Sequence, residues 1–227
     1  MHQSIEPAIL YFGTPVVLVS TLNSDGSANL APISSIFWLG WRCMIGVEGT
    51  SRTAGNLRRT GQCVLNLPSV CEMPAVNLLA LTTGADPVPP HKAARGYRHV
   101  GDKFAAAGLT AAGAETVAPP RVAECPVQLE AVLEGIHPMA DNDATLRGFV
   151  ACFELRIQRV HVHESLLLTG EPNRVDPEKW RPLIMSFQRF YGLGPEIAGS
   201  RLAMVPERAY RSPDVDRARR AERHRHG

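Results

Sequence analysis

The sequence predicts a mainly β protein with helical insertions, built on an antiparallel Greek-key β-barrel with a six-stranded core. Three observations support this class: strand-like runs follow one another across short turns, two later runs carry apolar residues at every second position, and one helical segment interrupts the β pattern. The chain has 227 residues, of which 44% are hydrophobic and 20% charged. A domain of this size and composition buries a core without disulfide bonds or structural metals.

The N-terminal part of the chain is predicted to form two β-hairpins. Residues 15–22 (PVVLVSTL) are rich in β-formers and run into the turn sequence NSDG at residues 23–26. Residues 28–38 form the next strand, and after a break at Gly40 residues 41–47 alternate well enough for another. Two consecutive hairpins indicate an antiparallel meander rather than βαβ units.

A short helix and a further strand follow the hairpins. Residues 49–53 open the helix, for which Thr50 or Ser51 is the expected N-cap and Gly61 the expected end. Residues 62–67 (QCVLNL) are the next strand, which ends at Pro68.

Residues 69–113 change the pattern from strands to helices. They contain helical stretches rich in Ala and Leu, and a turn-rich sequence at residues 86–90. We expect a helical insertion packed on the β core. Its length implies a role beyond connection, such as covering a pocket or contacting another subunit.

Two long strands are predicted at residues 123–137 and 147–163, joined by a loop at 138–143. Alternate positions are apolar in the first at Val127, Leu129, Ala131 and Leu133, and in the second at Phe149, Ala151, Phe153, Leu155 and Ile157. This alternation with a period of two predicts that one face of each strand points into the core.

Charge is distributed unevenly along the chain. The whole chain carries 24 Lys and Arg against 22 Asp and Glu, a net +2. Residues 206–227 hold seven Arg and four acids and so carry +3, which leaves −1 (2 − 3) for the rest. The net charge of the body therefore gives no support to a basic nucleic-acid-binding groove there. We expect residues 1–205 to form one domain and residues 206–227 to be a basic tail, disordered or a frayed helix.

The five cysteines indicate a reducing compartment, because their number is odd and no C-x-x-C sequence occurs. Cys43 and Cys152 lie in apolar runs, so we expect both to be buried. The first residues lack a signal-peptide pattern, and no apolar run approaches the length of a membrane helix. We therefore expect a soluble, cytoplasmic protein.

The sequence TSRTAGN at residues 50–56 is a candidate phosphate site. A helix N-terminus presents free backbone N–H groups to an anion, and the Arg52 guanidinium can bind two oxygens at once. The alternative is an ordinary N-cap with an exposed arginine.

The sequence NLAPISS at residues 29–35 is a candidate contact for a flat ring. Its small and hydroxyl side chains leave room beside the backbone, whose polar groups can match the edge of such a ring. The alternative is a β-strand that contains two serines by chance.

Together these stretches resemble the flavin reductase-like family of FMN-binding split-barrel proteins. The resemblance extends from residue 15 to about residue 194. It rests on PVVLVSTLNSDGSANLAPISS, TSRTAGNLRRTGQCVLNLPS, AECPVQLEAV, RVHV and RFYGLG. It implies an FMN-binding split β-barrel that forms a homodimer, with the flavin at or near the subunit interface.

The resemblance also implies site residues. The flavin ring is expected to contact Ala31, Ile33, Ser34 and Ser35. The ribityl phosphate is expected to contact Thr50, Ser51, Arg52, Thr53 and Asn56, with Asn66 a weaker candidate beside the same pocket. His161 lies where many relatives have a histidine near the flavin or nicotinamide, which makes it the candidate catalytic residue. Arg189 and Tyr191 match a C-terminal basic and aromatic element that reaches across the dimer.

A metal site at His161 and His163 is the alternative for these two side chains. They are two residues apart on a strand and share one face. No Asp, Glu or His pattern completes a ligand set, so we expect no metal. Neither G-x-G-x-x-G nor a P-loop occurs, so a nicotinamide nucleotide is not expected to bind in Rossmann fashion.

The resemblance therefore implies an FMN-dependent NAD(P)H oxidoreductase. Hydride would pass from NADH or NADPH to flavin N5, and electrons would pass on to oxygen, free flavin or a partner monooxygenase. An FMN-binding protein without reductase activity, such as a carrier, sensor or storage module, is the main alternative. The same barrel with haem or a deazaflavin is a third. Binding of nucleic acid by the tail is the least favoured.

Overall fold

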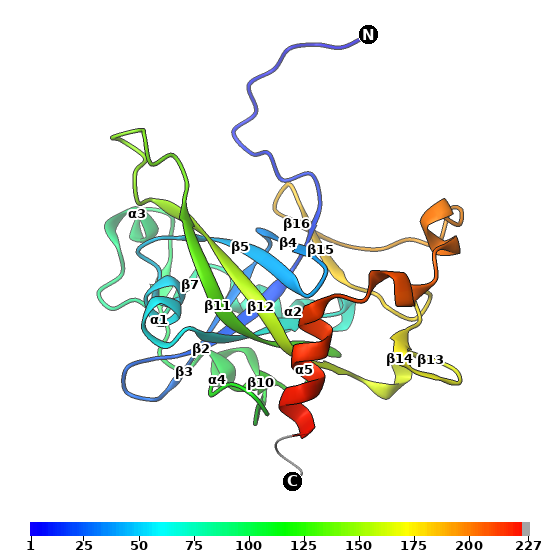
Figure 1. Cartoon of the computed structure of the whole chain (residues 1–227). Coiled ribbons are helices and arrows are strands. Elements are labelled where there is room, and N and C mark those ends of the chain that lie inside the picture. Colours follow the sequence, from blue (N-terminus) through cyan, green and yellow to red (C-terminus); the bar gives the residue numbers. More distant parts are fainter. Residues whose placement is uncertain (224–227) are drawn as a thin grey trace.

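The centre of the protein is an antiparallel sheet of seven strands that curves into a barrel (Figure 1). The computed structural model describes residues 1–223, with side chains to residue 220. The sheet order is β3-β2-β6-β11-β12-β5-β4. Its strands are β2 (Val17–Leu22), β3 (Ala28–Ile33), β4 (Ile36–Leu39), β5 (Arg42–Glu48), β6 (Gln62–Leu67), β11 (Val127–Pro138) and β12 (Val150–Val162). The mainly β split-barrel class predicted above is confirmed.

The two edge strands of this sheet, β3 and β4, belong to one continuous path of the chain. Only Ser34 and Ser35 separate them. The carbonyl of Ser35 accepts a hydrogen bond from the Gly46 N–H at 2.8 Å, so pairing with β5 continues through the bend. The strand expected at residues 28–38 therefore crosses from one edge of the sheet to the other and closes the barrel. Counted once, this path gives the six strands that were predicted.

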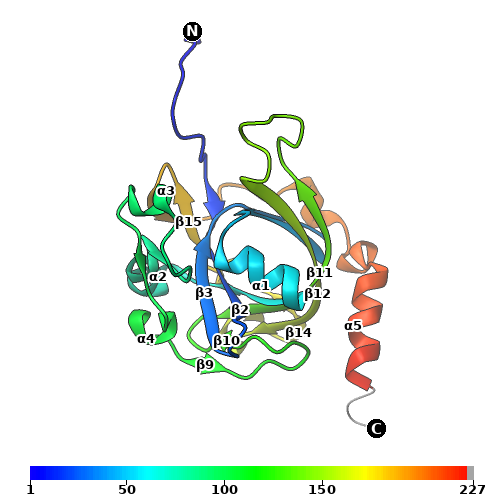
Figure 2. The same ribbon diagram turned by 90° about the vertical axis from the view of Figure 1, so that its left-hand side faces the viewer.

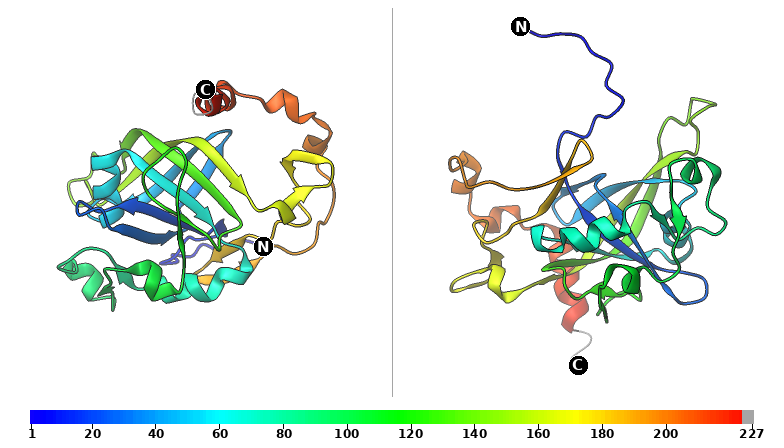
Figure 3. Two further views of the ribbon diagram at one scale, coloured as in Figure 1. Left: turned by 90° about the horizontal axis from the view of Figure 1, so that it is seen from below. Right: turned by 180° about the vertical axis from the view of Figure 1, so that it is seen from behind.

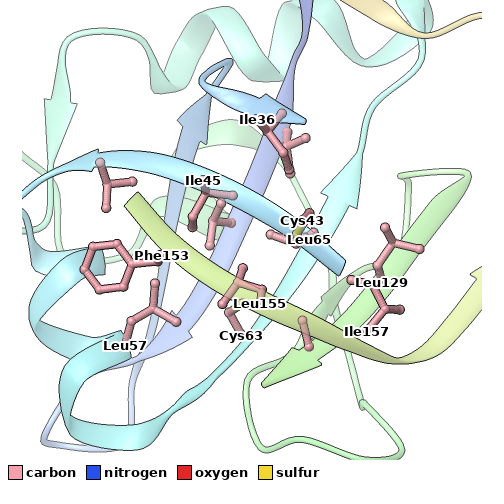
Figure 4. Close-up of a cluster of buried hydrophobic side chains, with 14 of the residues drawn as sticks. Ile36, Cys43, Ile45, Leu57, Cys63, Leu65, Leu129, Phe153, Leu155 and Ile157 are labelled. Carbon is pink, nitrogen blue, oxygen red and sulfur yellow. The ribbon is translucent and has the colours of Figure 1, made fainter. Parts of the chain in front are cut away.

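The first hydrophobic core fills the barrel (Figure 4). Phe153, Leu155 and Ile157 on β12 point inward at every second position, and each is at most 3% exposed. Leu57 enters from α1 (Arg52–Thr60), the helix that closes one end of the barrel (Figure 2). Each such side chain contributes about 1.5–3 kcal/mol by leaving water. Phe149, predicted to share this face, precedes the strand and is exposed.

A second core lies on the outer face of the barrel, under the insertion (Figure 3). The strand β2 is buried on both sides, because Val17 and Val19 face the barrel interior while Leu18 faces outward against the insertion. This double burial explains why its sequence is continuously apolar rather than alternating. The insertion and the segment after it contain η1 (Val70–Glu72), α2 (Met73–Leu79), β7 (Thr82–Thr83), α3 (Pro90–Ala93), β8 (Arg98–His99), α4 (Lys103–Ala107), β9 (Ala111–Ala112) and β10 (Arg121–Val122).

The C-terminal part of the chain adds small sheets and turns around the barrel. A three-stranded sheet joins the first strand of the chain to the last two. These elements are β1 (Thr14–Pro15), η2 (Glu164–Leu166), β13 (Leu167–Leu168), β14 (Glu171–Val175), β15 (Leu183–Ser186), β16 (Arg189–Gly192), η3 (Arg201–Met204), η4 (Glu207–Tyr210) and α5 (Pro213–Arg223).

The C-terminal segment, expected to be a disordered tail or a frayed helix, contains a helix. Residues 213–223 form α5, which lies along β12 (Figure 1). Asp214 in its first turn accepts a hydrogen bond from Arg42 Nε at 3.0 Å, and Ala218 is buried. Carboxylates in the first turn of a helix also interact favourably with the positive end of the helix dipole. The last four predicted tail residues lie outside the described part.

The cysteines carry free thiols. Cys43 is buried as expected, and burial raises its pKa to about 12, whereas Cys152 is only partly buried. Among the described residues, no helix combines the length and the apolar character that crossing a bilayer requires.

Candidate functional site

A cavity of about 630 Å³ lies outside the barrel, between the edge path of the sheet and the insertion. This volume is within the range of pockets that hold cofactors and other small ligands. One wall comes from β3, the end of β5 and the start of α1. The opposite wall comes from the insertion and the C-terminal hairpin, at Val76, Asn77, Leu79, Ala80, Leu81, Thr82, Thr83, Gly84, Lys92, Tyr97, Lys103, Met185, Gln188 and Phe190.

The start of α1 forms the polar corner of this cavity. Ser51 is the N-cap, and its hydroxyl accepts a hydrogen bond from the Ala54 N–H at 3.1 Å. Ser51, Arg52 and Thr53, three of the residues predicted to contact the ribityl phosphate, all line the cavity. The N–H groups of a first helical turn have no partner within the helix, and the helix dipole adds positive potential there. The corner therefore suits an anion.

Arg52 is held in place by the insertion. Its Nε donates a hydrogen bond to the carbonyl of Gly84 at 2.9 Å. Within the described part of the chain, no further hydrogen bond uses its two terminal nitrogens, which remain able to bind a ligand. Gly84 permits this approach because it has no side chain: a Cβ there would lie 2.4 Å from Asn29 Oδ1 and 3.3 Å from Arg52 Cγ.

The floor of the cavity is the path that joins β3 to β4. Ala31, Ile33, Ser34 and Ser35, the four residues predicted to contact a flat ring, all line it. Gly46 lies beneath them, where an added Cβ would be 3.2 Å from Ser35 Cβ. Small side chains and a glycine leave the backbone open to a planar ligand.

Lys103, at the start of α4, is a cavity residue that the sequence analysis missed. Its side chain lines the cavity and is only 3% exposed. No acceptor in the described part of the chain forms a hydrogen bond or ion pair with it. Burial, and then the nearby charge of Lys92, lower its pKa to about 8. The sequence held one indication that this lysine is buried. Lys103 lies four residues before the apolar Ala107, so the two share a helix face.

Three of the predicted phosphate contacts lie outside the cavity wall. Thr50 donates its hydroxyl to Glu48 at 2.8 Å. Asn56 donates to Thr21 Oγ1 and to Asn23 Oδ1, both at 3.0 Å, and so connects α1 to the β2–β3 hairpin. Asn66 is fully buried.

Asn66 joins three strands of the fold rather than lining the pocket. Its amide donates to the Leu18 carbonyl at 2.9 Å and accepts from the Val122 N–H at 2.8 Å. The side chain is 0% exposed. Its role in the structure is therefore to satisfy backbone groups between β2, β6 and β10.

His161 does not line the cavity either. Its Nε2 lies 2.7 Å from Oε1 of Glu130, a carboxylate that is 0% exposed. Burial raises the pKa of Glu130, but hydrogen bonds from His161, Thr116 and the Glu115 N–H outweigh it and lower the pKa to about 2. The predicted catalytic histidine on β12 is thus paired with the buried carboxylate of Glu130 on β11. The described residues contain no group of ligands able to hold a metal, and His163 caps η2.

The C-terminal hairpin reaches the cavity with different residues from those predicted. Phe190 and Gln188 line it. Arg189 and Tyr191 lie on the other face of β16 and are exposed, because neighbouring side chains of a strand point in opposite directions. Their predicted reach across a dimer remains a prediction.

Comparisons with known proteins agree with this fold. Flavoredoxin of Desulfovibrio vulgaris (Miyazaki F) superposes with a TM-score of 0.71 at 22% identity, over 90% of this chain and 100% of that one. Nitrilotriacetate monooxygenase component B from Bacillus cereus gives a TM-score of 0.68 at 21% identity, over 87% and 98%. Both likenesses concern the fold.

Sequence comparison extends the agreement beyond the fold. The uncharacterized protein YdfE of Bacillus subtilis (strain 168) is 35% identical over 195 residues, which cover 86% of this chain and 91% of that protein. The model of the flavin reductase-like domain matches residues 9–194. The chain therefore belongs to the flavin reductase-like domain family, and its function is a flavin-related redox function.

Proposed function

We propose that the protein is an FMN-dependent NAD(P)H oxidoreductase and that the cavity beside α1 holds the FMN. The charge of the cavity carries this proposal. Its lining cations in the described part of the chain are Arg52, Lys92 and Lys103, against the single carboxylate of Glu48. Three positive groups and one negative group suit a phosphate monoester, which carries nearly two negative charges at neutral pH.

The phosphate is assigned to the corner at the start of α1. There Ser51 and Thr53 offer hydroxyls, the first helical turn offers N–H groups, and Arg52 offers a guanidinium already oriented by Gly84. The residues present fit the group, because the corner combines donors with a glycine where a Cβ has no room.

The flavin ring is assigned to the floor between β3 and β4. Ala31 and Ile33 offer apolar contact, and Ser34 and Ser35 offer polar groups to the ring edge. Val76, Leu79 and Phe190 lie on the opposite walls and exclude water. When bound, the flavin supplies the redox chemistry, accepting a hydride equivalent from a reduced nicotinamide and releasing electrons to a second acceptor. The chain's own task is to bind, orient and desolvate it.

The acceptor we propose is free flavin, oxygen or a partner monooxygenase. The name of the Bacillus cereus neighbour, a monooxygenase component, supports the last of these. We also propose that the chain works in the cytoplasm as a homodimer. Exposed aromatic side chains beside the cavity support the dimer: Phe12 and Phe187 stack edge to face at 4.9 Å and are 75% and 44% exposed.

Anaerobic reduction of FMN tests the proposal directly. The protein is mixed with FMN, NADH or NADPH is added in parallel, and the loss of oxidised-flavin absorbance is followed. We expect bleaching well above the protein-free rate with at least one nucleotide. FMN that binds without bleaching would support the alternative of a flavin-binding protein without reductase activity. Absence of FMN binding would overturn both.

A further inference from the structure

Glu48, the last residue of β5, connects the barrel to the insertion at the cavity. Its Oε1 lies 2.6 Å from Nε2 of His91, and its Oε2 lies 3.3 Å from Nζ of Lys92. Thr50 also donates its hydroxyl to Oε1. Both carboxylate oxygens are therefore engaged, and both partners in the insertion belong to α3.

The helix α3 has few other means of attachment. It has four residues, and none of them is buried. A helix of one turn is unstable by itself. His91 adds one edge-to-face contact with Phe149, at 5.9 Å between ring centroids, and the Arg52–Gly84 hydrogen bond fastens the segment at its other end. Polar contacts to the barrel thus position α3, while the pairing of β7 with β8 holds the two ends of residues 84–97 together.

Through Lys92, the contact between α3 and Glu48 affects the wall of the cavity. Its side chain lines the cavity, is only 12% exposed, and lies with Nζ 6.0 Å from the ring centroid of Tyr97, another lining residue. The position of α3 therefore decides whether this part of the wall is present.

The charges around Glu48 keep it ionised. Burial raises its pKa, but the hydrogen bond from Thr50, the charge of Lys92 and the hydrogen bonds from His91 and Lys92 outweigh burial and leave the pKa lowered. Lys92 also lies near enough to Lys103, which lines the same cavity, for its charge to lower the pKa of Lys103. Without Glu48, Lys92 would face Lys103 with no compensating carboxylate.

We propose that Glu48 is a positioning residue that holds residues 84–97 closed over the cavity through His91 and Lys92, and that this closure sets how long the bound cofactor stays. The effect on how long the cofactor stays rests on the proposed function, whereas the closure of residues 84–97 by Glu48 does not.

Hydrogen–deuterium exchange of the full chain without flavin tests the closure. We expect Glu48→Ala to speed exchange in residues 84–98 by about tenfold, the size expected for loss of one charged hydrogen bond. Exchange in β6 and β11 should stay unchanged. Glu48→Gln keeps a hydrogen-bonding group without the charge and should be intermediate, and Glu196→Ala, at an exposed residue, is the matched control. Unchanged exchange in residues 84–98, or an equal rise in β6 and β11, would overturn the proposal.

A double-mutant comparison tests whether Glu48 acts through Lys92. If it does, the variant that combines Glu48→Gln with Lys92→Met should exchange no faster than the faster single variant. Independent, additive effects would contradict the pairing.

Release of FMN tests the effect on the cofactor. We expect Glu48→Ala to raise the FMN dissociation rate constant by about tenfold with little change in association, since the contact closes the wall after entry. An unchanged dissociation rate would overturn this half. If the unmodified chain binds no FMN, the proposed function fails, while the exchange experiment still decides the closure.

Discussion

Arg52 Nε and the Gly84 carbonyl lie 2.9 Å apart, so the first residue of α1 is hydrogen-bonded to the insertion that covers the cavity. The helix start and the insertion are separated by 32 residues in sequence, yet they form one corner. This contact fixes the plane of the guanidinium before any ligand arrives, which lowers the entropy lost on binding.

Replacing Arg52 should weaken FMN binding strongly. Arg52→Ala removes a charged donor from the phosphate corner, and we expect the Kd for FMN to rise roughly 10- to 150-fold, equivalent to about 1.5–3 kcal/mol. Titration by flavin fluorescence measures this. Arg147→Ala, in an exposed loop, should leave the Kd unchanged. An unchanged Kd in Arg52→Ala would remove the phosphate assignment.

A side chain at residue 84 should disturb the same corner. In Gly84→Ala the new Cβ meets Asn29 Oδ1 at 2.4 Å, which is closer than such atoms tolerate, so either the backbone or the buried Asn29 amide, which is hydrogen-bonded to Thr21 and Thr53, must shift. We expect a loss of stability of about 1–3 kcal/mol together with weaker FMN binding. Gly113→Ala, where no atom lies within 4 Å, is the control. Denaturant unfolding that gives the same midpoint for both variants would contradict this prediction.

Lys103 should reduce the stability of the flavin-free chain below about pH 8. Its pKa falls from 10.5 unfolded to about 8 folded. The unfolded chain therefore binds more protons between these values, and stability should rise as pH rises through this window. At pH 7, Lys103→Met should be more stable than the parent by about 2–4 kcal/mol. The advantage should shrink by pH 10. Urea unfolding at both pH values measures it, with the exposed Lys179→Met as control.

The affinity for FMN should depend on whether Lys103 is protonated. A bound anion favours the charged form of Lys103, so binding above about pH 8 takes up a proton. We expect the Kd of the parent chain to rise between pH 7 and pH 9.5 and that of Lys103→Met to change less. Parallel pH profiles for the two chains would show that the lysine does not face the ligand.

Asn66 should affect stability and leave cofactor binding intact. Asn66→Ala leaves the buried Leu18 carbonyl and Val122 N–H without the hydrogen bonds of this side chain. We therefore expect the free energy of unfolding to fall by about 2–3 kcal/mol. The Kd for FMN of the folded variant should match the parent. Asn142→Ala, in an exposed loop, controls for loss of an asparagine. A large change in Kd with unchanged stability would restore Asn66 to the site.

The elements that depend on local pattern could be predicted from the sequence. The alternation in β12 identified Phe153, Leu155 and Ile157 as core residues, and the Ser-Arg-Thr sequence identified the start of α1. The family resemblance, rather than the local pattern alone, pointed to Ala31, Ile33, Ser34 and Ser35, all of which line the cavity.

The features that depend on long-range register could not be predicted. Asn66 meets Leu18 and Val122, and His161 meets Glu130, only because particular strands pair in a particular register. Lys103 reaches the cavity because α4 packs on the outer face of β3, an arrangement that its own sequence does not specify.

The continuous path from β3 through Ser34 and Ser35 to β4 has a consequence for association. The free edges of the central sheet are short, six residues in β3 and four in β4, and the bend at Ser34 and Ser35 separates them, so neither offers another chain a long row of unpaired backbone groups. Aggregation by strand addition is therefore disfavoured at the barrel. If a second copy binds through side chains instead, substitutions of exposed apolar residues such as Phe12 or Phe187 should alter assembly without altering backbone pairing in that sheet.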